Sequence, residues 1–228
     1  MEPLVNAHLT RAAWLWHSIV AWDLAPVGHA LRMRWHGLDL AAQGCRELGL
    51  PGDRAKAHAA SGGPLLERVL NTLAIPSGSR VVDLGSGKGG AAITLSRYFA
   101  EVVGVELSPE LVEIAKANVR KLRLSNVQFT CGDAGGFVDL HRFDYVYMFD
   151  PFPQRVMAEV ASNLRKARVA YGRPGIVIYK NPVLEQELLS TGWRKKTQFP
   201  FRDSRPFGVY CASDDPGAGL NGHVASLC

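Results

Sequence analysis

The sequence predicts an α/β fold: a doubly wound, mainly parallel sheet with an N-terminal helical addition. Three observations predict it. Short apolar runs alternate with helical segments, a glycine-rich turn follows the first run, and acidic residues stand at the ends of the first three runs. Apolar strands separated by helices are typical of parallel sheets covered on both faces. The 228 residues, 47% hydrophobic and 21% charged, have the composition of one globular domain with additions.

The expected elements follow one another from residue 64. The segment Pro64–Leu73 repeats apolar residues at helical spacing after a proline that suits the first turn of a helix. Residues 108–122 give the clearest helix, because Ser108 can cap its N-terminus and its apolar residues form one stripe. The expected strands are residues 80–84, 102–107, 127–131, 143–150 and 175–180, with a final hairpin from 195–201 and 207–213.

Changes in composition divide the chain into three expected regions. Residues 1–62 are predicted to be a tryptophan-rich helical cap or lid, residues 63–213 the α/β domain that carries the site, and residues 214–228 a flexible, turn-rich tail. The apolar stretch 12–22 is shorter than the roughly 20 residues that a membrane span needs, so we expect no transmembrane segment.

Charge and cysteine content narrow the class of protein further. The formal charge of +5 is scattered along the chain, which predicts a solvated basic surface and argues against a nucleic-acid partner. The four cysteines form neither a C-x-x-C pair nor a zinc spacing, so we propose no metal site. Because no segment resembles a signal peptide, we expect reduced thiols and a cytoplasmic location.

The glycine-rich turn is the stretch "VVDLGSGKGG", residues 81–90. Its glycines match the dinucleotide-binding pattern G-x-G-x-x-G, yet Asp83 stands two places before the first of them. A carboxylate there would oppose a pyrophosphate by roughly 1 to 4 kcal/mol at 4 Å. S-adenosylmethionine instead carries an ammonium and a sulfonium, which an acidic residue favours. The charge of Asp83 therefore favours this cationic ligand over NAD.

Asp83, Gly85, Ser86 and Gly87 resemble the first motif of class I S-adenosylmethionine-dependent methyltransferases. The resemblance implies that Glu106, at the end of the second strand, binds the ribose hydroxyls and that Asp133 accepts from the adenine amine. Ser61 is placed near the cofactor carboxylate by position alone. The residues predicted to bind the cofactor are Asp83, Gly85, Ser86, Gly87, Glu106, Leu107, Gly132, Asp133, Ala134 and Ser61.

Each acidic residue also has a purely structural interpretation. Asp83 could cap a turn, Glu106 could cap the following helix, and Asp133 lies in a Gly-Asp turn that needs no ligand. The three residues in this order, at the ends of three successive strands, favour the cofactor site over these alternatives.

The turn after the fourth strand reads Asp150, Pro151, Phe152, Pro153. It resembles the [D/N]-P-P-[F/Y] signature of amino-group methyltransferases with the order changed, and the D-P-W-P stretch of tRNA guanine-N7 methyltransferases. The overall pattern from residue 80 to 193 is most similar to small bacterial methyltransferases of unassigned substrate. We predict Asp150, Pro151 and Phe152 as catalytic residues that meet the acceptor, the alternative being a rigid turn that ends a buried strand.

The resemblance implies a class I methyltransferase fold and an enzyme that uses S-adenosyl-L-methionine. We expect it to methylate a nitrogen of a protein side chain or of a small molecule. Two alternatives stay open: an NAD(P)-binding oxidoreductase, and a non-catalytic protein that binds a cofactor or a partner. The sequence does not identify the acceptor, the methylated atom or the oligomeric state.

Overall fold

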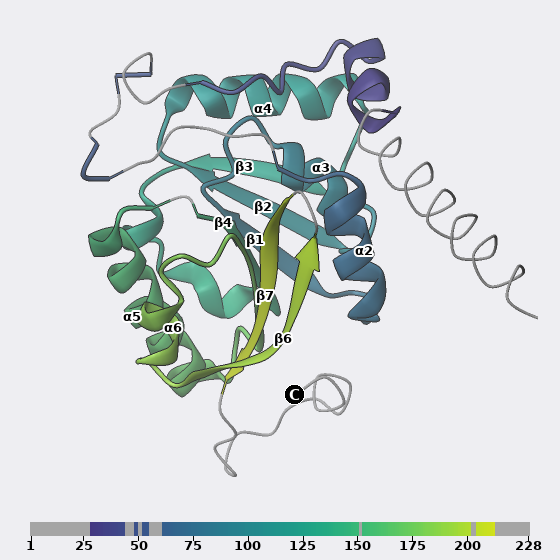
Figure 1. The fold of residues 1–228 in the computed structure, drawn as a ribbon. Helices are drawn as coiled ribbons and strands as arrows, with labels where there is room; N and C mark the ends of the chain where they lie inside the picture. The colour runs from purple at the N-terminus through teal and green to yellow at the C-terminus, as the bar shows by residue number, and fades with distance from the viewer. Residues whose placement is uncertain are drawn as a thin grey trace, which may run out of the picture.

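A seven-stranded sheet forms the centre of the computed structural model (Figure 1). The structure describes residues 28–43, 48–49, 52–54, 61–150, 152–201 and 204–212. The strands are β1 (Arg80–Leu84), β2 (Glu101–Glu106), β3 (Val127–Cys131), β4 (Tyr145–Phe149), β5 (Ile176–Lys180), β6 (Trp193–Phe201) and β7 (Ser204–Ala212). Their order is β3-β2-β1-β4-β5-β7-β6, and β7 is the one strand of this sheet that runs opposite to the other six. The predicted doubly wound, mainly parallel sheet is confirmed.

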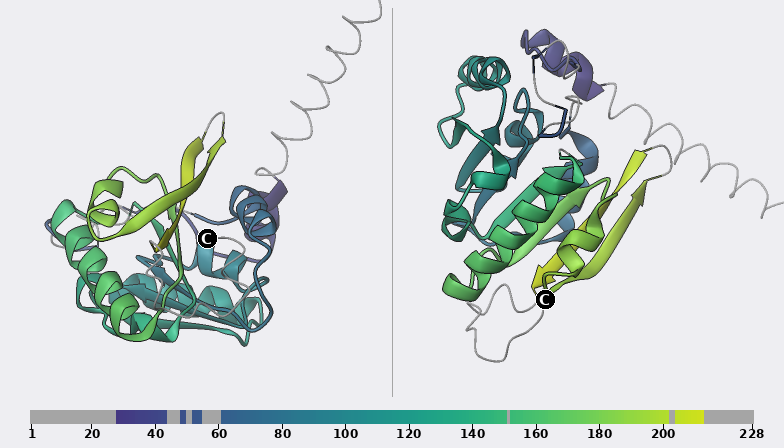
Figure 2. Two further views of the ribbon diagram at one scale, coloured as in Figure 1. Left: turned by 90° about the horizontal axis from the view of Figure 1, so that it is seen from below. Right: turned by 90° about the vertical axis from the view of Figure 1, so that its left-hand side faces the viewer.

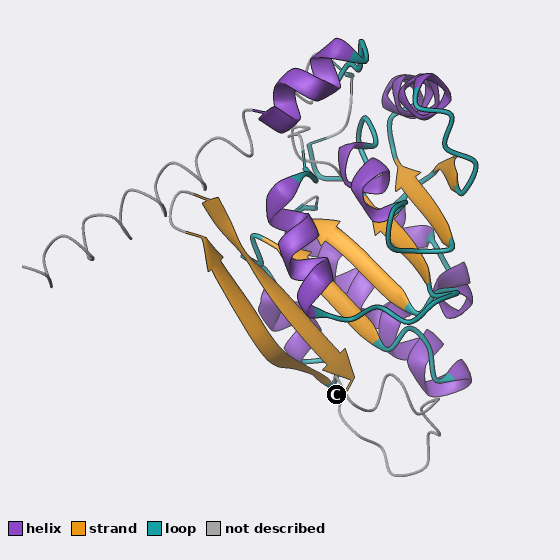
Figure 3. Ribbon diagram, turned by 90° about the vertical axis from the view of Figure 1, so that its right-hand side faces the viewer, coloured by secondary structure: helices purple, strands orange, loops and turns teal. Residues whose placement is uncertain are grey.

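Helices cover both faces of this sheet (Figure 3). They are α2 (Pro64–Thr72), α3 (Gly90–Leu95), α4 (Pro109–Lys121), α5 (Gln154–Tyr171) and α6 (Glu185–Leu189), with short 3-10 turns η1 (Ala134–Gly136) and η2 (Asp139–Arg142). The side chains of α2, α3 and the end of α4 share one core cluster with one face of the strands. Those of α5 and α6 share the other cluster with the opposite face. This double cover explains why the central strands are apolar on both faces.

Most expected elements have their predicted places. Ser108 caps α4, since its hydroxyl accepts from the Leu111 N–H at 3.3 Å. The final hairpin is confirmed as β6 and β7, and it projects from the edge of the sheet (Figure 2). Strand β4 is shorter than expected at both ends. The Asp144 carboxylate accepts from the Arg80 N–H at 2.9 Å, and Asp150 turns out of the strand with a φ of 33°.

The N-terminal part contributes a helix over residues 28–35, named the N-terminal helix below, and a strap that follows it. Within the strap, the Asp39 carboxylate accepts from the Lys88 ammonium at 2.8 Å, and the Asn118 side chain donates to the Asp39 carbonyl at 2.9 Å. These contacts join the strap to the loop before α3 and to α4. Most of the predicted lid and the predicted flexible tail lie outside the described residues, so the three-region division stays a prediction.

The structure also bears on the expected state of the cysteines and on the expected absence of a membrane span. Cys211 is disulfide-bonded, so the expectation that all thiols are reduced is wrong for this residue. None of the helices that the structure describes is long and apolar enough to span a membrane.

Gly104 in β2 gives a test of how tightly the sheet packs beside the site. A Cβ at this position would lie 2.5 Å from the Phe129 ring and 2.7 Å from the Ser86 hydroxyl. Gly104→Ala should therefore lower the free energy of unfolding by about 1 to 3 kcal/mol, measured by urea denaturation. Gly136→Ala, where no atom lies within 4 Å of the new Cβ, serves as the control. Equal stability of the two variants would contradict this packing.

Candidate functional site

The candidate site lies at the carboxyl ends of the parallel strands. From β1 the chain passes through α3 to β2 on one side, whereas β4 pairs with β1 on the other side. This reversal of direction is the point at which open α/β sheets bind ligands. The loops that follow β1, β2, β3 and β4 lie at this edge, and these loops together with the strand ends before them carry the predicted site residues other than Ser61.

The glycine loop after β1 is held against the end of β2. The N–H groups of Gly85 and Ser86 both donate to the Val105 carbonyl, at 2.8 and 3.1 Å. Gly85 and Gly87 have φ values of 77° and 53°, a region that side chains with a Cβ seldom adopt. The glycines of the sequence pattern are thus explained by the backbone conformation of this loop.

Glu106 joins the glycine loop to the loop after β2. Its two carboxylate oxygens accept from the N–H groups of Gly87 and Ser108, each at 2.9 Å, and the residue is 8% exposed. Ser108 is the N-cap of α4, so Glu106 does not cap that helix by itself. Each carboxylate oxygen can accept more than one hydrogen bond, which leaves room for a ligand hydroxyl. Leu107 is the first residue of the loop after β2. The ribose role of Glu106 stays a prediction.

Asp83 is buried at the end of β1 without a partner for one of its oxygens. The residue is 2% exposed, and its Oδ2 atom has no hydrogen bond to the residues that the structure describes. Burial, and then the charge of Glu106, raise the pKa of the Asp83 carboxyl to about 8. The buried hydroxyl of Ser86 also lacks a partner among the described residues. A cation at this point would stabilise the carboxylate, so the residues present fit the cationic end of S-adenosylmethionine.

Asp133, in the loop after β3, has partners on two sides. Its Oδ1 accepts from the Gly135 N–H at 2.9 Å, and its Oδ2 forms an ion pair with Arg54, which also pairs with Glu159 at 3.0 Å. The hydrogen bond from the Gly135 N–H agrees with the purely structural interpretation, in which Asp133 belongs to a turn that needs no ligand. Sequence reasoning missed Arg54, which lies 79 residues away and has no motif around it. The adenine contact of Asp133 stays a prediction.

The neighbours of Asp133 and the Ser61 loop complete the cofactor side. The Gly132 N–H donates to the Glu106 carbonyl at 2.9 Å, and Ala134 is buried. A Cβ built on Gly90 would lie 2.5 Å from the Ser61 carbonyl, so this loop passes directly over the start of α3. The structure therefore brings Ser61 to the glycine loop, while its predicted contact with the cofactor carboxylate is untested.

The predicted acceptor residues have different environments. The Asp150 carboxylate accepts from the Asn181 side chain at 3.0 Å, and the Asp150 N–H donates to the Lys180 carbonyl at 3.2 Å. Phe152 is 5% exposed and belongs to the core cluster beneath α5. Pro151 lies outside the described residues. The structure thus places Asp150 at the site edge and Phe152 in the core, and a catalytic role of either residue stays a prediction.

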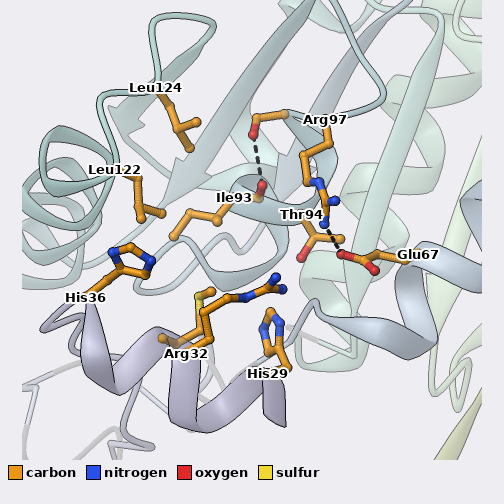
Figure 4. Close-up of a pocket in the computed structure, with 11 residues that line it drawn as sticks. His29, Arg32, His36, Glu67, Ile93, Thr94, Arg97, Leu122 and Leu124 are labelled. Atoms are coloured by element: carbon orange, nitrogen blue, oxygen red, sulfur yellow. Dashed lines mark hydrogen bonds and ion pairs between the residues drawn. The ribbon is translucent and has the colours of Figure 1, made fainter. Parts of the chain in front are cut away.

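A separate cavity of about 260 Å³ lies between the N-terminal helix, α2 and α3 (Figure 4). His29 and Arg32 face Arg97 across it, and Arg97 forms an ion pair with Glu67. Burial, and then the charge of Arg32, lower the pKa of His29. The cavity is lined by the end of α3, whereas the glycine loop leads into its start, so this cavity is not part of the strand-end site.

Comparison with known proteins identifies related sequences and folds. The model of a family described as "Methyltransferase domain" matches residues 75–202. A protein-L-isoaspartate O-methyltransferase of Thermotoga maritima is 34% identical over 101 residues, which are 42% of this chain and 32% of that protein. A 23S rRNA (uracil(1939)-C(5))-methyltransferase of Nitrosococcus oceani is 36% identical over 132 residues, 54% of this chain and 29% of that protein.

Two solved structures have the same fold. The magnesium protoporphyrin IX methyltransferase of Synechocystis with bound SAM has a TM-score of 0.53 at 18% identity, over 65% of this chain and 78% of that chain. A SAM-dependent methyltransferase of Aquifex aeolicus has a TM-score of 0.52 at 21% identity, over 64% of this chain and 87% of that chain. At these identities the likeness concerns the fold, and it confirms the predicted class I fold.

The relatives also correct one expectation. The chain spans 16%, 32% and 23% of the length of three curated relatives, of which two are named as tRNA and rRNA methyltransferases. The expectation that argued against a nucleic-acid partner is therefore not supported. The scattered positive charge could not decide whether the chain acts on nucleic acid, because net charge alone does not specify an acceptor.

The raised pKa of Asp83 predicts proton release on cofactor binding. At pH 7 the carboxyl is mostly protonated in the free protein, and a cation beside it lowers its pKa. Calorimetry with S-adenosylmethionine in buffers of different ionisation enthalpy should show close to one proton more released by the wild type than by Asp83→Asn. The variant should also bind more weakly. Equal proton release, or tighter binding by the variant, would rule out the charge role of Asp83.

Glu106 allows a second test of the cofactor side. Glu106→Ala should weaken binding of S-adenosylmethionine by about 1 to 3 kcal/mol, because charge-assisted hydrogen bonds to the ligand and to the glycine loop are both lost. Calorimetry measures the affinity, and Glu113→Ala on the exposed face of α4 is the control. Unchanged affinity in a folded Glu106→Ala variant would remove this residue from the site.

Proposed function

The chain belongs to the methyltransferase-domain family, and we propose that it transfers the methyl group of S-adenosylmethionine to a nitrogen of a protein side chain or a small molecule. The observation that carries this proposal is the buried, partly unsatisfied carboxylate of Asp83 beside the glycine loop. Such a group favours a cationic ligand. A cation stabilises the ionised form of this carboxyl, whereas the pyrophosphate of NAD(P) would oppose that form, which counts against the oxidoreductase alternative.

The bound cofactor would supply an activated methyl group, so no general base is obligatory. The part of this chain is to orient two reactants and to exclude water. Asp83 and Ser86 offer polar atoms to the methionine end, and Glu106 holds the glycine loop beside the position proposed for the ribose. These contacts would hold the reacting atom at the edge between β1 and β4.

On the acceptor side, Asp150 is the group that we assign to the incoming amine. Its carboxylate is oriented by the Asn181 side chain, 3.0 Å away, and lies at the end of the strand next to β1. A carboxylate there can accept a hydrogen bond from a neutral amine and so direct the nitrogen lone pair toward the methyl group. Phe152 supports this turn from the core below.

Transfer of a labelled methyl group to a fractionated cell extract tests the proposal. The label is expected in the protein fraction or the small-molecule fraction. Label in the RNA fraction would overturn the proposed acceptor while leaving the methyltransferase activity in place. Cofactor binding without label in any fraction would instead favour the non-catalytic alternative. The expected cytoplasmic location stays a prediction.

Asp150→Asn should separate turnover from cofactor binding. Asparagine tolerates the positive φ of this position and keeps an oxygen for Asn181, so the fold should be preserved. Affinity for S-adenosylmethionine should stay within a factor of ten, a difference under about 1.4 kcal/mol, while turnover falls by more than tenfold. Calorimetry and labelled methyl transfer measure the two quantities.

Asp139→Ala, at an exposed position in η2, is the matched control for this variant. A purely structural Asp150 would show itself by a joint loss of melting temperature and cofactor affinity. Full turnover of Asp150→Asn on the true acceptor would rule out the assigned role.

A further inference from the structure

The cavity of about 260 Å³ beside the N-terminal helix combines basic groups with an apolar wall (Figure 4). The N-terminal helix, the first turn of α2, the second half of α3 and the chain just after α4 all contribute to its lining. Ile93 of α3 and Leu122 after α4 belong to the apolar wall. The basic side chains of the lining are His29, Arg32, His36 and Arg97.

The N-terminal helix turns its basic side toward this cavity. His29, Arg32 and His36 are spaced by three and four residues, so they lie on one side of the helix and of the turn that follows it. Its apolar residues Leu31 and Trp35 are instead 63% and 89% exposed. A helix that served only to cover the domain would place its apolar residues inward. Apolar packing alone therefore does not explain which side of this helix faces the cavity.

The charges around the cavity do not cancel. Arg97 forms an ion pair with Glu67 at 2.5 Å, whereas Arg32 forms no ion pair within the described part of the chain. Arg32 and Arg97 against Glu67 leave one formal positive charge when both histidines are neutral.

His29 adds an unsatisfied polar atom to the same cavity. Its Nδ1 atom is buried and has no hydrogen-bond partner among the described residues. Its ring lies against the chain that leads into α2, because a Cβ built on Gly63 would be 2.9 Å from the ring. A buried polar atom without a partner is costly, so a ligand that bonds to it would be stabilised.

A small carboxylate with an apolar body matches these features. The planar guanidinium group binds a carboxylate through two parallel hydrogen bonds. One net positive charge suits a singly charged carboxylate better than a phosphate monoester, which carries about 1.5 to 2 negative charges near pH 7. The volume of about 260 Å³ is below the roughly 300 to 1,000 Å³ of pockets for drug-sized ligands, which indicates a smaller molecule.

We propose that this cavity is a binding site for a small organic carboxylate, whose carboxylate group lies between Arg32 and Arg97 and whose apolar body lies against Ile93 and Leu122. The site is separate from the strand-end site, because it is lined by the end of α3 whereas the glycine loop leads into the start of that helix. The inference does not depend on the proposed methyltransferase function.

The test uses ligand-observed NMR with hexanoate, benzoate and phenylacetate, each compared with its primary amide. The wild-type chain should bind at least one carboxylate at least tenfold more tightly than the matching amide. Arg32→Gln should weaken this binding at least tenfold at an unchanged melting temperature. Arg34→Gln is the matched control, since Arg34 is exposed on the same helix and does not line the cavity.

The pH dependence of binding gives a second readout. The charged groups that act on His29 are Arg32 on its own helix, Glu67 on α2 and Arg97 after α3. Burial, and then the charge of Arg32, hold the pKa of His29 below its ordinary value, and a bound carboxylate would raise it. The affinity for the carboxylate should therefore rise as the pH falls from about 8 to about 6, a range in which the ligand stays ionised. His29→Gln, which keeps His36, should show a smaller rise.

Several results would overturn the inference. Binding of none of the three carboxylates, or equal affinity for carboxylates and amides, would exclude the anion site. Full binding by Arg32→Gln, or an equal loss in Arg34→Gln, would exclude the assigned position. Phenyl phosphate that binds tenfold more tightly than phenylacetate would exclude the choice of a carboxylate. Binding that S-adenosylmethionine abolishes and Arg32→Gln leaves unchanged would place the probe in the strand-end site instead.

Discussion

The site depends on one constraint, the burial of the Asp83 carboxylate at the end of the central strand. Glu106, at the end of the neighbouring strand, uses two backbone N–H groups to satisfy its oxygens, whereas one oxygen of Asp83 has no partner among the described residues. A buried carboxyl without a cation is held in its neutral form. A glycine loop without bulky side chains follows this group, and the glycine at position 104 leaves room for the Phe129 ring and the Ser86 hydroxyl to pack beside it. The chain therefore maintains an unfavourable electrostatic situation that a cationic ligand would relieve.

The edge of the sheet divides into two halves with different chemistry. Around β1, β2 and β3, backbone N–H groups and carboxylates dominate, and Arg54 connects the N-terminal part of the chain to Asp133. Around β4, β5 and β7, phenylalanine rings and cations dominate. Relatives with one shared domain have names that specify protein, RNA and porphyrin acceptors. The acceptor half is thus the part of this fold in which specificity is expected to differ, since function depends on the site and not on the fold.

The chain turns out of two neighbouring strands, β4 and β5, with an unusual backbone conformation. Asp150 after β4 and Asn181 after β5 both have positive φ values, 33° and 53°, and their side chains are hydrogen-bonded to each other. Backbone in this region is unfavourable for residues other than glycine, although asparagine and aspartate tolerate it better than most. The hydrogen bond helps to hold both turns in place. The acceptor turn is consequently a fixed structure supported by the next strand, which is a requirement for aligning a nucleophile.

The sequence by itself determined the succession of strands and helices along the chain, the glycine loop and the acidic residues at the ends of the first three strands. These features are local: an apolar run, a glycine with positive φ or a helix cap depends on residues close together in the chain, and so each leaves a pattern that can be recognised. Only the tertiary structure decided which side chains lie together and which polar atoms find a hydrogen-bond or ion-pair partner. The partner of Asp133 is Arg54, the aromatic rings beside the Lys180 ammonium belong to β4 and β7, and Phe152 points into the core. Such contacts join residues far apart in sequence, and burial, which sets the pKa of Asp83 and Lys180, exists only once the sheet and its helices have packed together.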